Sequence, residues 1–126
     1  MEAASGKTMT ILAAMTIELS NRHCKPCEGG VAPMGRTEAE ATMDQVPGWE
    51  LAGDAKSIQR RFEFKGFYKT MSFVNAMAWI ANAENHHPDF TPGYNYCEVT
   101  FTTHAIDGLS ENDFICAAKV NALLDS

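Results

Sequence analysis

Apolar and polar residues alternate along two stretches of the chain, a period that is typical of strands with one buried face. The first stretch is residues 58–65, in which Arg60 is a charged residue on the apolar side. An arginine on such a face lies more often at a strand end or an interface than in a core. The second stretch is residues 97–104, and residues 49–51 form a shorter candidate. We therefore predict two long strands and one short one.

Two short helices are predicted from their start signals. The sequence TEAE at residues 37–40 has the form of a capping box, and helical residues continue to residue 46, before Pro47-Gly48 ends them. The sequence SEND at residues 110–113 resembles a second capping box. We expect an amphipathic helix over residues 114–124 after it.

The longest helix is predicted over residues 67–83, where apolar residues recur at helical spacing. Its apolar side holds Phe67, Met71, Val74, Ala78 and Ala81, and is widened by Phe73, Met77 and Ile80. This arc covers roughly half of the helix, with Tyr68 and Trp79 on the remaining side. Covering one sheet needs a narrower stripe, so we predict that this helix also packs on another chain and that the protein is an oligomer. The alternative is a well-buried helix in a monomer.

The elements follow in the order helix, strand, strand, helix, strand, helix. This order favours the α+β class, with an antiparallel sheet covered by helices on one face. The other face would be polar, or part of a pocket or interface. We expect one domain over residues 23–126, preceded by a poorly ordered leader over residues 1–22. The alternative is that the first residues lie upstream of a second start at Met9 or Met15.

Composition narrows the class of partner. The 126 residues carry a net charge of -6 and their one basic cluster is Arg60-Arg61, which argues against a nucleic-acid partner. No apolar run approaches the roughly 20 residues that cross a bilayer, so no membrane partner is expected. Four cysteines at irregular spacing do not form a secreted disulfide framework, which favours a reducing, cytoplasmic compartment.

The candidate chemistry lies in the sequence ENHHPDF at residues 84–90, where His86 and His87 end the long helix. The following segment can bring His104, at the end of the next strand, beside them. A zinc site would use three such ligands, but adjacent histidines on a helix diverge by about 100°. A role at the helix end explains one histidine, not three. Acid–base catalysis remains, because imidazoles can take and give protons near neutral pH.

Cys24-Lys-Pro-Cys27 is a second motif, whose C-x-x-C spacing occurs in zinc sites and in redox pairs. His23 could supply a third zinc ligand, but a fourth is not evident. Cys97 and Cys116 are expected in the core, on a strand and on a helix. A metal or redox role for the motif is therefore a hypothesis, and only half of the residues that such a site needs can be identified.

The motif ENHHPDF followed by YNYCEVTFTTHAIDGLSENDF, with CKPCEGGVAP and VPGWEL upstream, resembles the pterin-4a-carbinolamine dehydratase family over about residues 24–124. The resemblance implies an α+β fold with a single antiparallel four-stranded sheet and about three helices on one face, assembled as dimers or tetramers. It implies a hydro-lyase that dehydrates 4a-hydroxytetrahydropterin to quinonoid dihydropterin, recycling tetrahydrobiopterin for aromatic amino-acid hydroxylases. It implies no metal and no cofactor.

The same resemblance assigns roles to residues. The family's histidine triad corresponds to His86, His87 and His104, and we expect His86 and His104 to transfer protons while His87 orients the pterin. The substrate-binding residues that it implies are Asn85, Pro88, Phe90, Thr102, Thr103 and Asp107. Two departures from the family's pattern bear on rate and pterin preference: Asn82 stands where many members have glutamate, and Phe90 where many have tryptophan.

Other classes of function stay open beside the enzyme. The fold also serves as a dimerisation cofactor for a transcription factor, in which case residues 67–83 would meet a partner helix. Related domains that have lost activity assist the assembly of other enzymes, although all three histidines are retained here. A hydrolase with histidine-bound zinc is a third hypothesis, which metal analysis of the purified protein decides.

Overall fold

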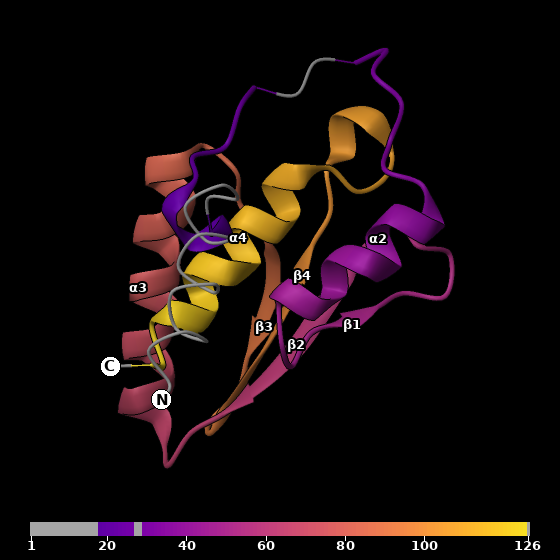
Figure 1. The fold of residues 1–126 in the computed structure, drawn as a ribbon. Helices are drawn as coiled ribbons and strands as arrows, with labels where there is room; N and C mark the ends of the chain where they lie inside the picture. Colours follow the sequence, from indigo (N-terminus) through magenta and orange to yellow (C-terminus); the bar gives the residue numbers. More distant parts are fainter. Residues whose placement is uncertain (1–17, 27–28, 126) are drawn as a thin grey trace, which may run out of the picture.

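The computed structural model describes residues 18–26 and 29–125 of the chain (Figure 1). Within these residues, three α-helices, four strands and three short 3₁₀ turns follow one another. In chain order they are η1 (Leu19–Asn21), α2 (Arg36–Thr42), η2 (Met43–Gln45), β1 (Glu50–Leu51), β2 (Ile58–Glu63), α3 (Phe67–Glu84), β3 (Asp89–Pro92), β4 (Tyr96–Phe101), η3 (His104–Ile106) and α4 (Glu111–Ala122). The strands form one antiparallel sheet in the order β1-β2-β4-β3.

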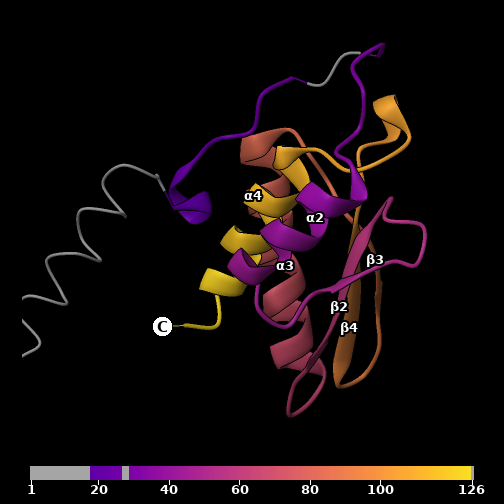
Figure 2. The same cartoon turned by 45° about the vertical axis from the view of Figure 1, so that its right-hand side comes forward.

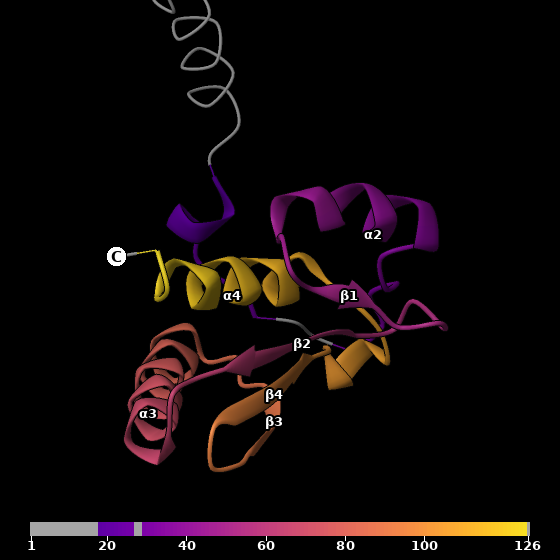
Figure 3. The same ribbon diagram turned by 90° about the horizontal axis from the view of Figure 1, so that it is seen from below.

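The α-helices lie together on one side of this sheet, as Figure 2 shows. In the view of Figure 3, α4 lies between α3 and α2, and it contacts both α3 and the η2 turn that continues α2. The predicted fold is therefore confirmed: it is α+β, with a single antiparallel four-stranded sheet and three helices on one face.

The core fills the space between the helices and the two central strands. The register of β2 against β4 pairs Ile58 with Phe101 and Phe62 with Cys97, and all four side chains are buried. On the helix side, α4 contributes a continuous buried run over residues 112–117. The period-two pattern predicted this face correctly because burial on one side of a strand selects every second residue.

The sheet departs from the predicted strands at two places. The edge strand β3 has four exposed residues and ends in a proline, so it leaves no alternation in the sequence and escapes prediction from the pattern. The strand predicted over residues 97–104 is wrong at its end, because β4 stops at Phe101. Thr103 turns back to form a bridge with Gly108, and His104 begins η3.

The two predicted capping boxes have different outcomes. α2 begins at Arg36 after Gly35, which has no side chain for a cap, so the box predicted at residues 37–40 is wrong. The box at residues 110–113 is confirmed, since Ser110 and Asp113 each bond to the other's backbone N–H. α4 therefore begins at Glu111, three residues before the predicted start.

The helix α3 has a buried side and an outward side that still carries large apolar residues. Its buried residues are Thr70, Phe73, Val74 and Met77. Phe67 and Ala78, expected on the core stripe, are exposed, so the core side is rotated from the predicted one. Tyr68 and Trp79 are 85% and 74% exposed. The outward side of α3 thus exposes large aromatic residues to solvent.

Arg60 lies within β2 on the helix-covered side, and not at a strand end. Its guanidinium donates to Pro47 O at 3.1 Å and to Asn121 Oδ1 at 2.7 Å, and lies 4.5 Å from the centroid of the Phe62 ring. Gly48 makes room for it, because a Cβ at that position would come within 2.7 Å of the guanidinium. The arginine therefore covers the margin of the core, with its guanidinium held by two hydrogen bonds and an aromatic ring.

The first described residues pack on α4. Leu19 is a core residue, and Lys119 Nζ donates to Ser20 O at 2.9 Å. The packed part of the chain thus includes η1, ahead of the boundary expected after residue 22, whereas residues 1–17 of the expected leader lie outside the described residues. None of the helices in the described part of the chain is long and apolar enough to cross a membrane.

Candidate functional site

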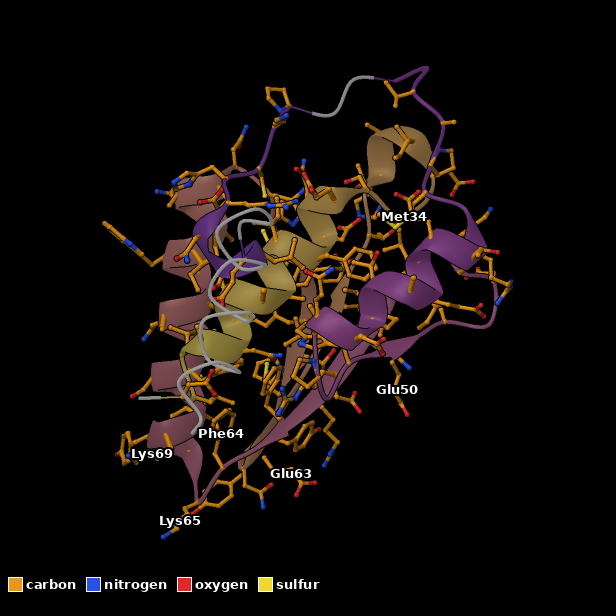
Figure 4. The ribbon with its side chains drawn as sticks, in the orientation of Figure 1. Met34, Glu50, Glu63, Phe64, Lys65 and Lys69 are labelled. Atoms are coloured by element: carbon orange, nitrogen blue, oxygen red, sulfur yellow. The ribbon has the colours of Figure 1, made fainter. Side chains whose placement is uncertain are left out.

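A pocket of about 520 Å³ lies where α3 ends and η3 begins. Its walls come from residues 83–87 at the end of α3, from residues 102–105 after β4, and from residues 24–26. The last three belong to the N-terminal strap, which we define as residues 22–26. Figure 4 shows the labelled side chains Glu63, Phe64, Lys65 and Lys69 at the opposite end of the molecule, where α3 starts. The pocket is therefore at the histidine end.

The adjacent histidines reach this pocket because the helix ends in a left-handed turn. Asn85 has φ 53° and ψ 42°, a conformation that asparagine adopts more readily than most residues. The His86 N–H then donates to Ala81 O at 3.1 Å, which closes the last turn. Since His86 and His87 follow this turn, the helical divergence of 100° per residue does not apply, and both line the pocket.

His86 is held by a buried carboxylate. Its Nε2 lies 2.7 Å from Oδ1 of Asp113, whose side chain has no exposed surface. A carboxylate only accepts hydrogen bonds, so Nε2 carries a proton and Nδ1 is the nitrogen available for proton transfer. The imidazole also stacks on the ring of Phe101, with centroids 6.0 Å apart and planes 11° from parallel. Two contacts therefore fix the orientation of the ring.

The second oxygen of Asp113 connects it to the strand side of the pocket. Oδ2 accepts the Ser110 N–H at 3.0 Å and the Thr103 hydroxyl at 2.8 Å. Because the Thr103 proton goes to Asp113, the Ser110 hydroxyl donates to Thr103 Oγ1, which lies 2.8 Å away. The sequence assigns Asp113 to a helix cap alone, and nothing in the pattern signals that its other oxygen meets a histidine.

His87 presents one nitrogen to the pocket. Its Nδ1 lies 3.2 Å from Pro88 O, and a carbonyl can only accept, so the neutral ring carries its proton on Nδ1. The lone pair on Nε2 is then left to accept a hydrogen bond or a proton. The side chain is exposed and lines the pocket, so this nitrogen is well placed to orient a bound heterocycle.

His104 is the least constrained of the three histidines. Its Nε2 lies 3.8 Å from Oδ2 of Asp89, at the start of β3, and both side chains are 69% exposed. A contact of this length between two exposed side chains contributes little to stability. The ring can therefore turn toward a ligand in the pocket that it lines.

Six of the nine predicted site residues meet at this pocket: Asn85, His86, His87, Thr102, Thr103 and His104. The other three do not line it. Pro88 is buried, and Phe90 lies on the edge strand β3, paired with Val99. Asp107 bonds to Lys56 at 3.1 Å, with most of its side chain exposed. A binding role for these three stays a prediction that rests on the resemblance alone.

The turn after β4 is held to the loop before β2 through Lys56. Thr102 donates its hydroxyl proton to Lys56 O at 2.6 Å, so a predicted substrate-binding hydroxyl already has a structural partner. The hydrogen bond from the Lys56 ammonium to Asp107 raises the pKa of Lys56. These contacts place Thr102 and Thr103 beside the histidines.

Glu84 is the buried anchor of the strap. Only 5% of its side chain is exposed, and it accepts the Cys24 N–H at 2.7 Å and a bond from His23 Nδ1 at 2.9 Å. Burial alone would raise the pKa of Glu84, but these two bonds and the nearby Lys119 ammonium lower it overall. Glu84 is an anchor that the resemblance did not point to.

Asn112 anchors the next residue of the strap on α4. Its Oδ1 accepts the Lys25 N–H at 3.0 Å, and its amide donates to Lys25 O at 2.6 Å. Arg22 adds a pair with Glu111. Residues 21–36 have the composition of a loop, so the sequence does not predict that the strap forms a wall of the pocket. The strap is held in place by residues 60 and 87 positions away in the chain, which a local pattern does not reveal.

The CKPC motif is only partly described. Among residues 18–26 and 29–125, no group of three or more His, Cys, Asp and Glu side chains is arranged to hold a metal ion. Cys27 lies outside the described residues, and His23 is bonded to Glu84. The Sγ of Cys24 lies 3.5 Å from the Sγ of Cys116, on α4.

Comparison with known sequences finds one family. The family described as pterin 4 alpha carbinolamine dehydratase matches residues 32–123. A Nitrosomonas eutropha protein, provisionally named a pterin-4-alpha-carbinolamine dehydratase, is 58% identical over 110 residues, covering 86% of this chain and 96% of that protein. A Legionella pneumophila protein with the same provisional name is 54% identical over 111 residues, covering 87% and 98%.

Two solved structures share the fold. The transcriptional coactivator/pterin dehydratase from Brucella melitensis has a TM-score of 0.69 and 31% identity, covering 72% of this chain and 97% of that one. A pterin dehydratase-like protein identified as a RuBisCO assembly factor in the alpha-carboxysome has a TM-score of 0.55 and 26% identity, covering 63% and 92%. Relatives are thus described both as dehydratases and as factors that act on other proteins.

Proposed function

The chain belongs to the pterin-4-alpha-carbinolamine dehydratase family, and we propose that it dehydrates 4a-hydroxytetrahydropterin to quinonoid dihydropterin. The observation that carries the proposal is the pocket in which His86, His87 and His104 meet. The reaction removes water, so it needs one group that takes a proton and one that gives a proton. Imidazoles do both near neutral pH.

The proposed reaction balances with side chains of this pocket alone. The substrate carries a hydroxyl group on C4a and a proton on N5. A base takes the N5 proton, its electron pair forms the C4a–N5 double bond, and the C4a–O bond breaks. An acid protonates the departing hydroxyl, which leaves as water. The base and the acid then exchange one proton, directly or through solvent, to restore the starting state.

His86 is our candidate for the base. The carboxylate of Asp113, 2.7 Å from Nε2, would stabilise the positive charge that the ring acquires when Nδ1 takes a proton. His104 is our candidate for the acid, because its exposed ring can regain a proton from water between turnovers. His87 would orient the pterin through Nε2, and Thr102 and Thr103 would border it.

Ultraviolet absorbance tests the proposed activity. 4a-Hydroxytetrahydropterin is generated enzymatically, and its decay is followed with the protein, without it, and with protein unfolded by heat, all in the presence of a chelator. The proposal expects faster decay with folded protein alone. Equal decay in all three samples would refute it. Acceleration that the chelator abolishes would favour a zinc-dependent reaction in its place.

The physiological role that we propose follows from this product. Quinonoid dihydropterin is the form that is reduced to tetrahydropterin, so the enzyme would recycle tetrahydrobiopterin for aromatic amino-acid hydroxylases. We place this activity in the cytoplasm, on the cysteine usage that favours a reducing compartment. Release of quinonoid dihydropterin in a coupled hydroxylase assay, and its rate with and without the protein, tests the recycling role.

A second candidate function is the binding of another protein, favoured by the outward side of α3. Tyr68 and Trp79 are eleven positions apart, so they lie about 20° apart around the helix and form one face. We propose that a second copy of the chain covers this face, giving a homodimer or homotetramer. The relative described as an assembly factor supports a further partner; a partner helix that competes with self-association would identify that role.

A further inference from the structure

Cys24 and Cys116 form a pair of thiols that the proposed reaction does not use. Their Sγ atoms lie 3.5 Å apart, although the residues are 92 positions apart in the chain. Cys24 belongs to the strap, is half-buried and lines the pocket, whereas Cys116 is fully buried in α4. A disulfide bond is about 2.05 Å long, so the two sulfurs need to approach by only about 1.5 Å.

The strap holds Cys24 at this place through its own backbone. The Cys24 N–H donates to Glu84 at 2.7 Å, and Lys25 makes two bonds with the side chain of Asn112. The Cys24 thiol also lies 3.6 Å from Asn112 O, in the first turn of α4. These contacts bring the two thiols together without any covalent constraint, so their proximity belongs to the reduced fold.

We propose that Cys24 and Cys116 are a disulfide site, at which a low-molecular-weight disulfide such as oxidised glutathione joins the strap to α4 and fixes one wall of the pocket. The inference does not depend on the dehydratase reaction. Cys24 precedes residues 32–123, the part of the chain that matches the family, whereas Cys116 lies within that part.

Accessibility sets the order of the two steps. Cys24 lines a pocket of about 520 Å³ that a small disulfide can enter, whereas Cys116 has no exposed surface. Cys24 therefore attacks first and Cys116 second. A hydrogen bond that the Cys116 thiol donates to Cys24 Sγ favours the protonated thiol and is the main cause that raises the pKa of Cys116, followed by burial. Once Cys24 carries the small thiol as a mixed disulfide, this hydrogen bond is lost and Cys116 is easier to ionise.

The exchange balances in atoms and electrons. The Cys24 thiolate attacks one sulfur of the small disulfide, forms a mixed disulfide, and expels one small thiolate. The Cys116 thiolate then attacks the sulfur of Cys24 and expels the second. The two cysteines lose two electrons in total, the small disulfide gains them, and the two cysteine protons pass to the two small thiolates.

The disulfide would change how firmly the strap, one wall of the pocket, is held. In the reduced protein the strap is held by the hydrogen bonds of Glu84 and Asn112, which local opening can break. A disulfide bond between Cys24 and Cys116 would add a covalent link to these reversible hydrogen bonds. Cys116 Sγ also lies 3.8 Å from His86 O, so the bridge would be anchored directly beside the histidine segment.

Mass spectrometry of the full chain, after incubation with oxidised glutathione, tests the site. Digestion after Lys, Arg and Glu places Cys116 in the peptide over residues 112–119, separate from Cys97. We expect a cross-link between this peptide and the one that contains Cys24. We also expect the amide hydrogens of Cys24 and Lys25 to exchange at least about tenfold more slowly than in the reduced protein. The Tm should rise by on the order of 10 °C.

Cys27 supplies the sharpest control, because a C-x-x-C bridge from Cys24 to Cys27 is the competing product. The cross-link to residues 112–119 should form equally in Cys27→Ser and be absent from Cys24→Ser. Cys116→Ala should lose the Tm rise, and its fold is checked by circular dichroism. Oxidation that stops at glutathionylated Cys24, or that joins Cys24 to Cys27 in the unmodified chain, would overturn the proposal. So would a cross-link that leaves amide exchange in the strap unchanged.

Discussion

His86 Nε2 and Asp113 Oδ1 lie 2.7 Å apart, across 27 positions of the chain, with the carboxylate fully buried. The same carboxylate caps α4 by accepting the Ser110 N–H. Asp113 therefore has two roles: it caps the N-terminus of α4, and it fixes the ring of His86 in the pocket. The position of that ring depends on a helix start that lies outside the histidine motif.

Asp113→Asn should lower the dehydration rate more than its effect on folding explains. The amide keeps the shape of the carboxylate but loses the charge that would stabilise protonated His86. We expect kcat to fall by about 10- to 100-fold, a part of the total contribution of a general base, with little change in KM. Steady-state kinetics at neutral pH, alongside urea unfolding, measures both effects.

The matched control is Ser110→Ala, which weakens the same helix cap but leaves the bond between His86 and Asp113 in place. Loss of such a cap costs about 1 kcal/mol of stability, and kcat should stay near the wild-type value. If Asp113→Asn retained wild-type kcat while losing stability to the same extent as Ser110→Ala, Asp113 would be a helix cap and nothing more.

Glu84→Gln should destabilise the protein in a pH-dependent way. The folded pKa of Glu84 is lowered from its ordinary value of 4.5, so its ionised form stabilises the fold. This contribution is complete above about pH 4.5 and is lost as the pH falls through the folded pKa. We expect the variant to lose about 1–3 kcal/mol of unfolding free energy at pH 7, with the difference from wild type shrinking in acid.

Urea unfolding from pH 7 down to pH 3.5 measures this difference. The control is Glu111→Gln, which removes a carboxylate that also pairs with the strap, through Arg22, but whose side chain is 49% exposed. An exposed pair is worth less than about 1 kcal/mol. A pH-independent difference between wild type and Glu84→Gln would show that the carboxylate charge does not hold the strap.

Trp79→Glu should break self-association. Trp79 is 74% exposed on the outward side of α3, and a buried aromatic anchor at an interface is commonly worth about 2–4 kcal/mol. The dissociation constant should therefore rise by at least about 30-fold. Sedimentation equilibrium measures it. Val31→Glu, at a 62% exposed apolar residue away from α3, is the control and should leave the mass unchanged. A wild-type monomer would contradict the proposed oligomer.

The sequence predicts those parts of the fold in which burial repeats at a fixed period. β2 and β4 bury every second residue, and α3 shows a helical period, so both patterns are visible in the chain. β3 buries none of its residues and gives no pattern. The capping box at residues 37–40 misleads because a threonine followed by glutamate fits the interior of a first turn equally well, and Gly35 holds the cap position.

The residues of the candidate site also divide into those that the sequence predicts and those that it does not. His86, His87 and His104 stand out as a local motif beside helix and strand ends, and the pocket brings them together. The residues that hold the pocket walls do so over long distances in the chain: Asp113 bonds to His86, 27 positions away, and Glu84 to Cys24, 60 positions away. Such contacts follow from the packing of α4 and the strap, which a single sequence does not encode as a period.

The most direct test of the central claim compares the dehydration rate of wild type with that of His86→Ala and His104→Ala, in chelator. His23→Ala is the matched control, because His23 does not line the pocket and its side chain is 82% exposed. We predict that the His86→Ala and His104→Ala variants each lose about 10²–10⁴-fold in kcat while folding normally, and that His23→Ala stays near wild type. Wild-type rates in both His86→Ala and His104→Ala would contradict histidine acid–base catalysis at this pocket.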